Sequence, residues 1–236
     1  MTLLLIAGLC ANPFYNANFT SLPERSLSVF CNPAGTGIRT GAEGFFTYHY
    51  DSDIITAGVS LANLGIGFHK TEDTTYFEVG AGVKLPGAFS IGYAYQFDNS
   101  DDYDISTHIV GFICRAAPTS SIGFRTTLGE RNHIFGGVSI KPYEQYVVLS
   151  VDLEYEGIDS IFAYYYGVVV QPLPGFRINF HADDEFNWNA GCEVSFGKVI
   201  VAGAYSHEDK KFSGGIILSA QNYDTFLQTS TTTITY

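Results

Sequence analysis

The chain has 236 residues, of which 15% are charged and 15% are aromatic, and its formal net charge is −12. A water-soluble domain usually carries about 25% charged residues, so this composition favours a protein with a largely apolar exterior. The acidic balance argues against nucleic-acid binding, because no basic stripe is available to neutralise phosphates. The length allows one large domain or two small ones.

The N-terminal residues Met1–Ala11 contain an apolar core that is too short to cross a membrane as a helix. Such a core is typical of a secretory signal, although no Lys or Arg precedes it and no clean small-residue cleavage site follows. We therefore predict a signal peptide over residues 1–17, with a first buried strand or an anchor as the alternative. No later segment has about 18 consecutive apolar residues, which excludes a helical membrane protein.

Two segments lack a sustained period. Asn12–Thr40 is rich in Asn, Pro, Gly and Ser, and is predicted to be irregular chain that precedes the first strand. Thr225–Tyr236 is rich in Thr and alternates poorly. We expect residues 221–236 to form a last strand or a linker.

Between these segments the chain alternates with a strict two-residue period, and Phe186–Phe196 is the clearest example. One parity of this run is apolar, whereas the other consists of polar or very small residues. A strand places successive side chains on opposite faces, so one face would be apolar throughout. The run also matches the roughly 9–11 residues that a tilted strand needs to cross a bilayer.

Similar runs follow one another from Gly41 onward, separated by Gly, Pro, Asn and Asp. The expected strands are Glu43–Tyr50, Ile54–Ala62, Leu64–Lys70, Thr75–Leu85, Ala88–Phe97, Tyr103–Ile113, Ser120–Leu128, His133–Lys141, Gln145–Glu156, Ser160–Gln171, Gly175–Ala182, Phe186–Phe196, Lys198–His207 and Lys211–Ala220. Tight turns are expected at Lys141–Glu144, Pro172–Gly175 and Gly197. The pattern predicts an all-β fold, an antiparallel transmembrane β-barrel of about 12–14 strands over residues 43–220. A water-soluble β-sandwich would alternate in the same way and is the alternative.

The polar parity of these strands indicates which side chains face the barrel interior. An Arg or Lys placed toward lipid at mid-depth would cost about 2–4 kcal/mol, whereas an inward charge can pair or meet water. The predicted lumen-facing residues are Glu78, Lys84, Arg125, Asp152, Glu154, Arg177, His181 and Glu193.

Motifs for metal binding or catalysis are lacking in the sequence. The four cysteines form no CxxC pair, and the acidic clusters Asp98–Asp104 and Asp183–Glu185 lack the spacing of a calcium loop. Six histidines are scattered, and none lies beside a G-x-S-x-G nucleophile motif. We therefore predict no metal site, no cofactor and no enzymatic activity.

The segment Phe30–Gly35, followed by Thr40–Gly44, resembles the mature N-terminal region of the long-chain fatty-acid transporter superfamily and of the related Por-type secretion-associated barrels. In that superfamily an Asn-Pro-Ala element begins a hatch that folds into the lumen of a fourteen-stranded barrel. The resemblance implies that residues 18–42 form a short N-terminal plug, whose motif is Asn32, Pro33, Ala34 and Gly35. The chain is much shorter than typical transporters, which leaves little room for large ligand-capturing loops.

Gly175–Phe180 and the glycine-rich strand ends are also similar to small barrel domains that precede a peptidase-like domain. Two functions are therefore expected for a barrel in the bacterial outer membrane. The first is passive uptake or carriage of a hydrophobic small molecule through the bilayer. The alternative is a membrane anchor or interaction barrel for a partner protein or for a C-terminal domain outside this sequence. A continuous apolar passage would favour uptake, and a lumen filled by the protein's own charges would favour the anchor.

Overall fold

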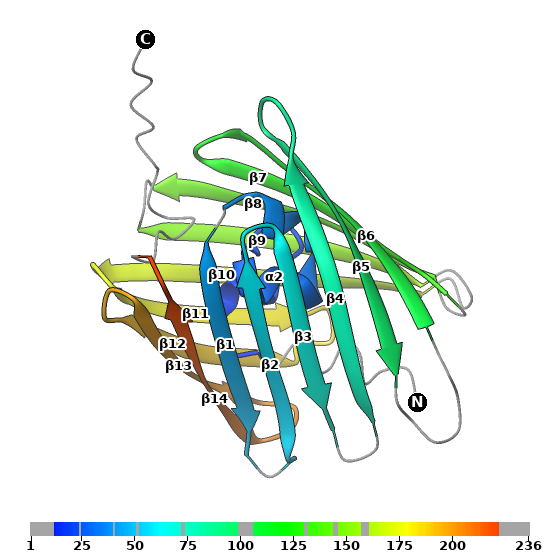
Figure 1. Ribbon diagram of the computed structural model, residues 1–236. Helices are drawn as coiled ribbons and strands as arrows, with labels where there is room; N and C mark the ends of the chain where they lie inside the picture. The colour runs from blue at the N-terminus through cyan, green and yellow to red at the C-terminus, as the bar shows by residue number, and fades with distance from the viewer. Residues whose placement is uncertain are drawn as a thin grey trace.

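The computed structural model describes residues 12–23, 25–39, 41–50, 52–71, 74–98, 106–129, 132–143, 146–156 and 161–221. Within them, fourteen antiparallel strands form one closed barrel in which each strand pairs with the next along the chain and β1 pairs with β14 (Figure 1). The strands are β1 Ala42–His49, β2 Ile54–Leu61, β3 Leu64–Lys70, β4 Thr75–Lys84, β5 Phe89–Asp98, β6 Ser106–Ala117, β7 Ser120–Leu128, β8 His133–Tyr143, β9 Val147–Glu156, β10 Ile161–Leu173, β11 Phe176–Asp183, β12 Trp188–Ser195, β13 Val199–Ser206 and β14 Lys211–Ser219. The predicted β-barrel is confirmed, at the upper end of the expected strand number.

Two of the expected tight turns begin later in the chain than predicted. β8 continues to Tyr143 and β10 to Leu173, so Pro142 and Pro172 lie inside strands. The pairing register shifts at both places, between Ile140 and Tyr143 and between Val170 and Leu173. A proline lacks the N–H that a regular ladder uses, and a bulge tolerates that loss. Pro142 and Pro172 therefore mark bulges, and the turn after β10 lies at Pro174 and Gly175, within the expected range.

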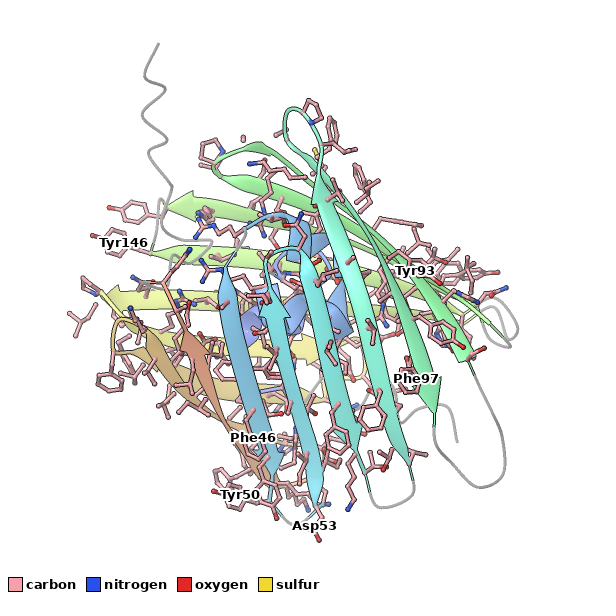
Figure 2. All side chains as sticks on the ribbon, viewed as in Figure 1. Phe46, Tyr50, Asp53, Tyr93, Phe97 and Tyr146 are labelled. Carbon is pink, nitrogen blue, oxygen red and sulfur yellow. The ribbon has the colours of Figure 1, made fainter. Side chains whose placement is uncertain are left out.

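The outer face of the barrel is apolar, as the alternation predicts. In β9, Val151 and Leu153 are 53% and 37% exposed, whereas Asp152 and Glu154 are each 3% exposed. Aromatic side chains such as Phe46 and Tyr93 also point away from the barrel wall (Figure 2). This exterior suits lipid better than water, because large apolar patches are rare on soluble monomers. The described residues contain no helix that is long and apolar enough to cross a membrane.

The two ends of the barrel differ in their connections. At the end where β1 begins and β14 ends, short connections such as residues 62–63 join the strands, and we call it the turn end. The opposite end, where residues 207–210 join β13 to β14, is called the loop end. Gly175, in the turn between β10 and β11, has a φ of 79°, in the left-handed region that favours glycine.

The segment that precedes β1 folds back into the barrel (Figure 1). It contains four short helical turns, η1 Tyr15–Ala17, η2 Arg25–Leu27, α2 Ser28–Cys31 and η3 Pro33–Gly37. Nearly all of its described side chains from Asn12 to Gly37 are buried, and we call residues 12–37 the plug.

The structure bears on two limits of the expected plug, residues 18–42. Ala42 is the first residue of β1. Asn12–Ala17, which lie within the predicted signal peptide, pack inside the lumen, where Phe14 and Tyr15 are each 1% exposed. The cleavage site itself remains a prediction, because residues 1–11 lie outside the described residues. The same holds for the tail beyond residue 221.

Candidate functional site

The lumen of the barrel is the candidate functional site, and glycines on its wall make room for the plug. A Cβ atom added to any of these glycines would collide with a plug residue, and the plug residue differs from one glycine to the next. The contacting pairs are Gly67 with Phe30, Gly92 with Pro33, Gly111 with Asn32, Gly123 with Thr20, and Gly215 with Phe14. At Gly92 and Gly123 the nearest plug atoms belong to the backbone, so the wall approaches the plug too closely there for any side chain.

A first buried carboxylate, Glu193 of β12, holds the start of the plug. Its Oε1 atom accepts a hydrogen bond of 2.9 Å from the backbone N–H of Tyr15. Its Oε2 atom lies 3.1 Å from Nη1 of Arg177 on the neighbouring strand β11. The carboxylate is thus bonded to the wall on one side and to the plug on the other.

A second buried carboxylate, Asp152 of β9, holds the middle of the plug. Its Oδ2 atom accepts hydrogen bonds of 2.7 Å from both the backbone N–H and the hydroxyl of Thr20. Beside it, the Ser21 hydroxyl lies 2.6 Å from that of Ser139, and Ser121 donates to the Ser21 carbonyl over 2.6 Å. Hydrogen bonds to a charged group are stronger than neutral ones, so Asp152 is the centre of this contact.

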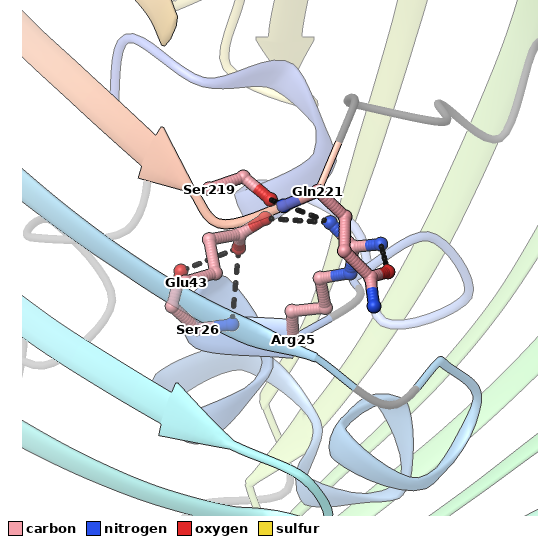
Figure 3. Close-up of polar contacts among 5 residues, drawn as sticks. All are labelled: Arg25, Ser26, Glu43, Ser219 and Gln221. Atoms are coloured by element: carbon pink, nitrogen blue, oxygen red, sulfur yellow. Dashed lines mark hydrogen bonds and ion pairs between the residues drawn. The ribbon is translucent and has the colours of Figure 1, made fainter. Parts of the chain in front are cut away.

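A third carboxylate, Glu43, belongs to a latch at the turn end (Figure 3). It accepts hydrogen bonds from the N–H and the hydroxyl of Ser26, at 3.2 and 2.6 Å, and forms an ion pair of 3.4 Å with Arg25. Arg25 also donates to Ser219 on β14 over 3.1 Å and to Gln221 over 3.4 Å. Glu43 and Ser219 are direct partners in the pairing of β1 with β14. The plug therefore binds both strands at the seam that closes the barrel.

The Asn32–Gly35 motif lies in the buried interior of the plug. Asn32 begins η3, and its Nδ2 atom lies 2.8 Å from the Thr20 carbonyl and 3.2 Å from the wall carbonyls of Phe112 and Phe124. Its Oδ1 atom accepts from the N–H of Ala34, whose carbonyl accepts a hydrogen bond of 2.6 Å from Ser90. The motif thus fastens the plug to strands on the opposite side from Glu193.

The structure places the predicted lumen residues as follows. Glu78, Arg125, Asp152, Glu154, Arg177, His181 and Glu193 are buried. Lys84 differs: it has the inward parity but is the last residue of β4 and is exposed at the turn end. A long charged side chain at the end of a strand can reach water, so parity alone does not bury it.

Sequence reasoning missed the latch residues Arg25, Ser26 and Glu43. Arg25 and Ser26 lie in irregular chain, where no periodicity assigns a face. Glu43 alternates with Phe45, and both point inward, so β1 has no purely polar parity. The useful signal was the charged residue at the very start of the first strand.

On the loop-end side of the plug, two small cavities of about 20 and 40 Å³ lie beside Arg125 and Cys31. Among the described residues, the Oε1 atom of Glu78 and the Nε atom of Arg125 have no hydrogen-bond partner, and neither do the Oδ1 atoms of Asn18 and Asp152. Glu154, by contrast, accepts from Tyr165 over 3.0 Å and lies 3.0 Å from His133.

Among the described residues, no group of three or more His, Cys, Asp or Glu side chains could hold a metal ion. Burial raises the pKa of the Cys31 thiol to about 12, which keeps it protonated and weakly nucleophilic.

No protein-family model matches the sequence, and no curated protein matches it either. Among solved structures, the chain is similar to the outer membrane protein Omp33 of Acinetobacter baumannii, with a TM-score of 0.55 and 10% identity over 79% of this chain and 100% of that one. It is also similar to a mutant of the Rh. blastica porin, with a TM-score of 0.49 and 8% identity over 76% of this chain and 98% of that one.

The likeness to Omp33 shows a shared barrel fold. The class that the fold defines is the outer-membrane β-barrel, because strands can cross a bilayer only when the barrel is closed and its exterior is apolar. This protein is a bacterial outer-membrane β-barrel of fourteen strands whose N-terminal segment fills part of its lumen.

Proposed function

We propose that this protein is a closed outer-membrane barrel that serves as a membrane anchor or interaction barrel, for a partner protein or for a domain outside this sequence. The observation that carries the proposal is the attachment of the plug to the wall. Buried carboxylates on three separate strands, Glu43, Asp152 and Glu193, each accept a backbone N–H of the plug. A passive pore needs an open lumen, whereas these hydrogen bonds would hold the plug in place across it.

The energy of these contacts supports a closed resting state. Withdrawing the plug would break the Arg25–Glu43 pair and the hydrogen bonds that Asp152 and Glu193 accept from the plug. A hydrogen bond to a charged group contributes about 1.5–3 kcal/mol, and each 1.4 kcal/mol is about a tenfold change in an equilibrium. These contacts therefore favour the closed state.

Carriage of a hydrophobic small molecule is the second candidate function. It is favoured by the cavity of about 40 Å³ beside Phe19, Phe135 and Tyr165. It is also favoured by the resemblance of Asn32–Gly35 to the hatch of the fatty-acid transporters. Asp152, Arg125 and His181 line the same cavity, and this polar lining argues against a continuous apolar passage.

Conductance across planar bilayers tests the proposal. Refolded wild-type protein should insert without steady ion current, and the double variant Glu43→Gln/Asp152→Asn should show bursts of current as the plug loosens. A steady wild-type current of porin size would overturn the proposal. Uptake of a labelled long-chain fatty acid into wild-type proteoliposomes faster than into empty liposomes would favour the carrier function over the anchor function.

A further inference from the structure

The smaller cavity is lined by a buried carboxylate, one oxygen of which has no hydrogen-bond partner among the described residues. Glu78, on β4, is 1% exposed and lines this cavity, which has a volume of about 20 Å³. Its Oε1 atom has no hydrogen-bond partner. A buried carboxylate can only accept hydrogen bonds, and leaving it without donors is costly. The Oε1 atom of Glu78 can therefore accept from a donor other than the described residues.

The walls of the cavity beside Glu78 are aromatic. Phe30 of the plug packs edge-on against Phe45 and Tyr76, with ring centroids 6.0 and 6.2 Å apart. Tyr76 in turn stacks on His69 at 4.7 Å, and all four rings line the cavity. Aromatic faces attract cations, and a set of rings around a pocket is a known way to hold an ammonium group.

Among the described residues, two charged groups line the cavity, Glu78 and Arg125. The guanidinium carbon of Arg125 lies 5.3 Å from the centroid of Phe135, which directs this cation toward a ring of the neighbouring cavity. Asp152 lines that neighbouring cavity and already accepts two hydrogen bonds from Thr20. Glu78 is therefore the carboxylate of the smaller cavity that can still accept from a ligand.

We propose that this cavity is a binding site for a primary ammonium group, either the ammonium ion or the head of a small alkylamine. A volume of about 20 Å³ has room for one or two water-sized groups, and an ammonium ion is of that size. It would donate N–H bonds to Glu78 while its remaining surface faces the rings of Phe30 and Tyr76. A tetramethylated ammonium is too large and has no N–H to donate.

The cavity faces the loop end of the barrel. Its lining residues Thr56, His69 and Tyr76 lie within the first or last few residues of their strands at that end. Tyr76 is only partly buried. A ligand would therefore arrive from the side opposite to the Arg25–Glu43 latch, without displacing the plug.

Isothermal titration calorimetry on the full refolded protein in detergent tests this proposal, with methylammonium chloride as the probe and sodium chloride at equal ionic strength as the control. We expect saturable binding of methylammonium and at least tenfold weaker binding of tetramethylammonium. Glu78→Gln should weaken methylammonium binding at least tenfold. Glu154→Gln is the matched control, because Glu154 is equally buried but already bonded to His133 and Tyr165, and it should bind as the wild type does.

Two results would overturn the proposal: methylammonium heats that match sodium chloride, which would mean ordered water only, or equal binding by wild type and Glu78→Gln. Heat-modifiable mobility shows whether each variant folds. If Glu78→Gln does not fold, nuclear magnetic resonance of ¹⁵N-ammonium with the wild-type protein replaces it. A slowly exchanging bound ammonium signal would support the site, and its absence would refute it.

Discussion

The two halves of the lumen differ in the hydrogen-bond partners of their buried carboxylates. On the side that faces the turn end, Glu43 and Glu193 each bind a plug N–H and a neighbouring arginine. On the side that faces the loop end, the carboxylate of Glu78 is just as buried, yet its Oε1 atom has no hydrogen-bond partner among the described residues. The difference between these carboxylates indicates that Glu43 and Glu193 hold the plug in place and that Glu78 is available to a ligand.

The largest effect should come from the latch. Glu43→Ala would leave the guanidinium of Arg25 buried without its carboxylate, and losing one partner of a buried pair costs about 3–5 kcal/mol. We expect the free energy of unfolding in detergent, measured by urea titration, to fall by that amount. Glu185→Ala, at an exposed connection on the loop end, is the control and should change it by less than about 0.5 kcal/mol. Equal effects of the two variants would show that the latch does not hold the plug.

A substitution on the lipid face gives a reference value for the loss of unfolding free energy in both halves of the lumen. Leu153→Arg places a charge between the inward-facing Asp152 and Glu154 but on the outer side, where Leu153 is 37% exposed. The expected loss is about 2–4 kcal/mol in lipid bilayers, because an arginine near the midplane is poorly solvated. Reversible unfolding in liposomes measures it. An unchanged stability would mean that this face does not contact lipid.

The fit between wall and plug predicts a smaller loss. Gly67→Val would drive a side chain into the ring of Phe30, and overpacking of this kind costs about 1–3 kcal/mol. Gly136→Val is the matched control, because a Cβ atom there meets nothing within 4 Å. The same urea titration checks both variants. If Gly67→Val were as stable as the control, Phe30 would not be packed against β3.

The smallest effect on stability is expected in the loop-end half. Glu78→Gln removes a charge without breaking a hydrogen bond at Oε1, so without added ligand the free energy of unfolding should change by less than about 1 kcal/mol. Urea unfolding of Glu78→Gln and Glu43→Gln in parallel gives the comparison. A loss at Glu78 as large as that at Glu43 would remove the distinction between the two halves.

The wall could be predicted from the sequence, because its pattern is local. A two-residue period and the cost of charge in lipid are enough to assign Val151 and Leu153 outward and Asp152 and Glu154 inward. The plug contacts could not be predicted in the same way. Thr20 meets Asp152 across 132 positions of sequence, and the irregular chain around Arg25 has no period that would assign its side chain a partner. The exposure of Lys84 at the end of β4 could not be predicted for a related reason, since the two-residue period assigns a face of the strand but not a depth along the barrel axis.

The presence of the plug inside the folded barrel is the central claim, and Cys31 tests it most directly. The Cys31 thiol is buried, donates to the Ala17 carbonyl over 2.8 Å and has a pKa raised to about 12 by burial. At pH 8 roughly one Cys31 thiol in ten thousand would be ionised. The experiment uses a variant whose other cysteines are replaced by alanine. Alkylation should therefore be negligible in the folded, heat-modifiable barrel and become rapid only on unfolding in urea. Alkylation of the folded barrel at the rate of the unfolded chain would show that the plug lies outside the lumen.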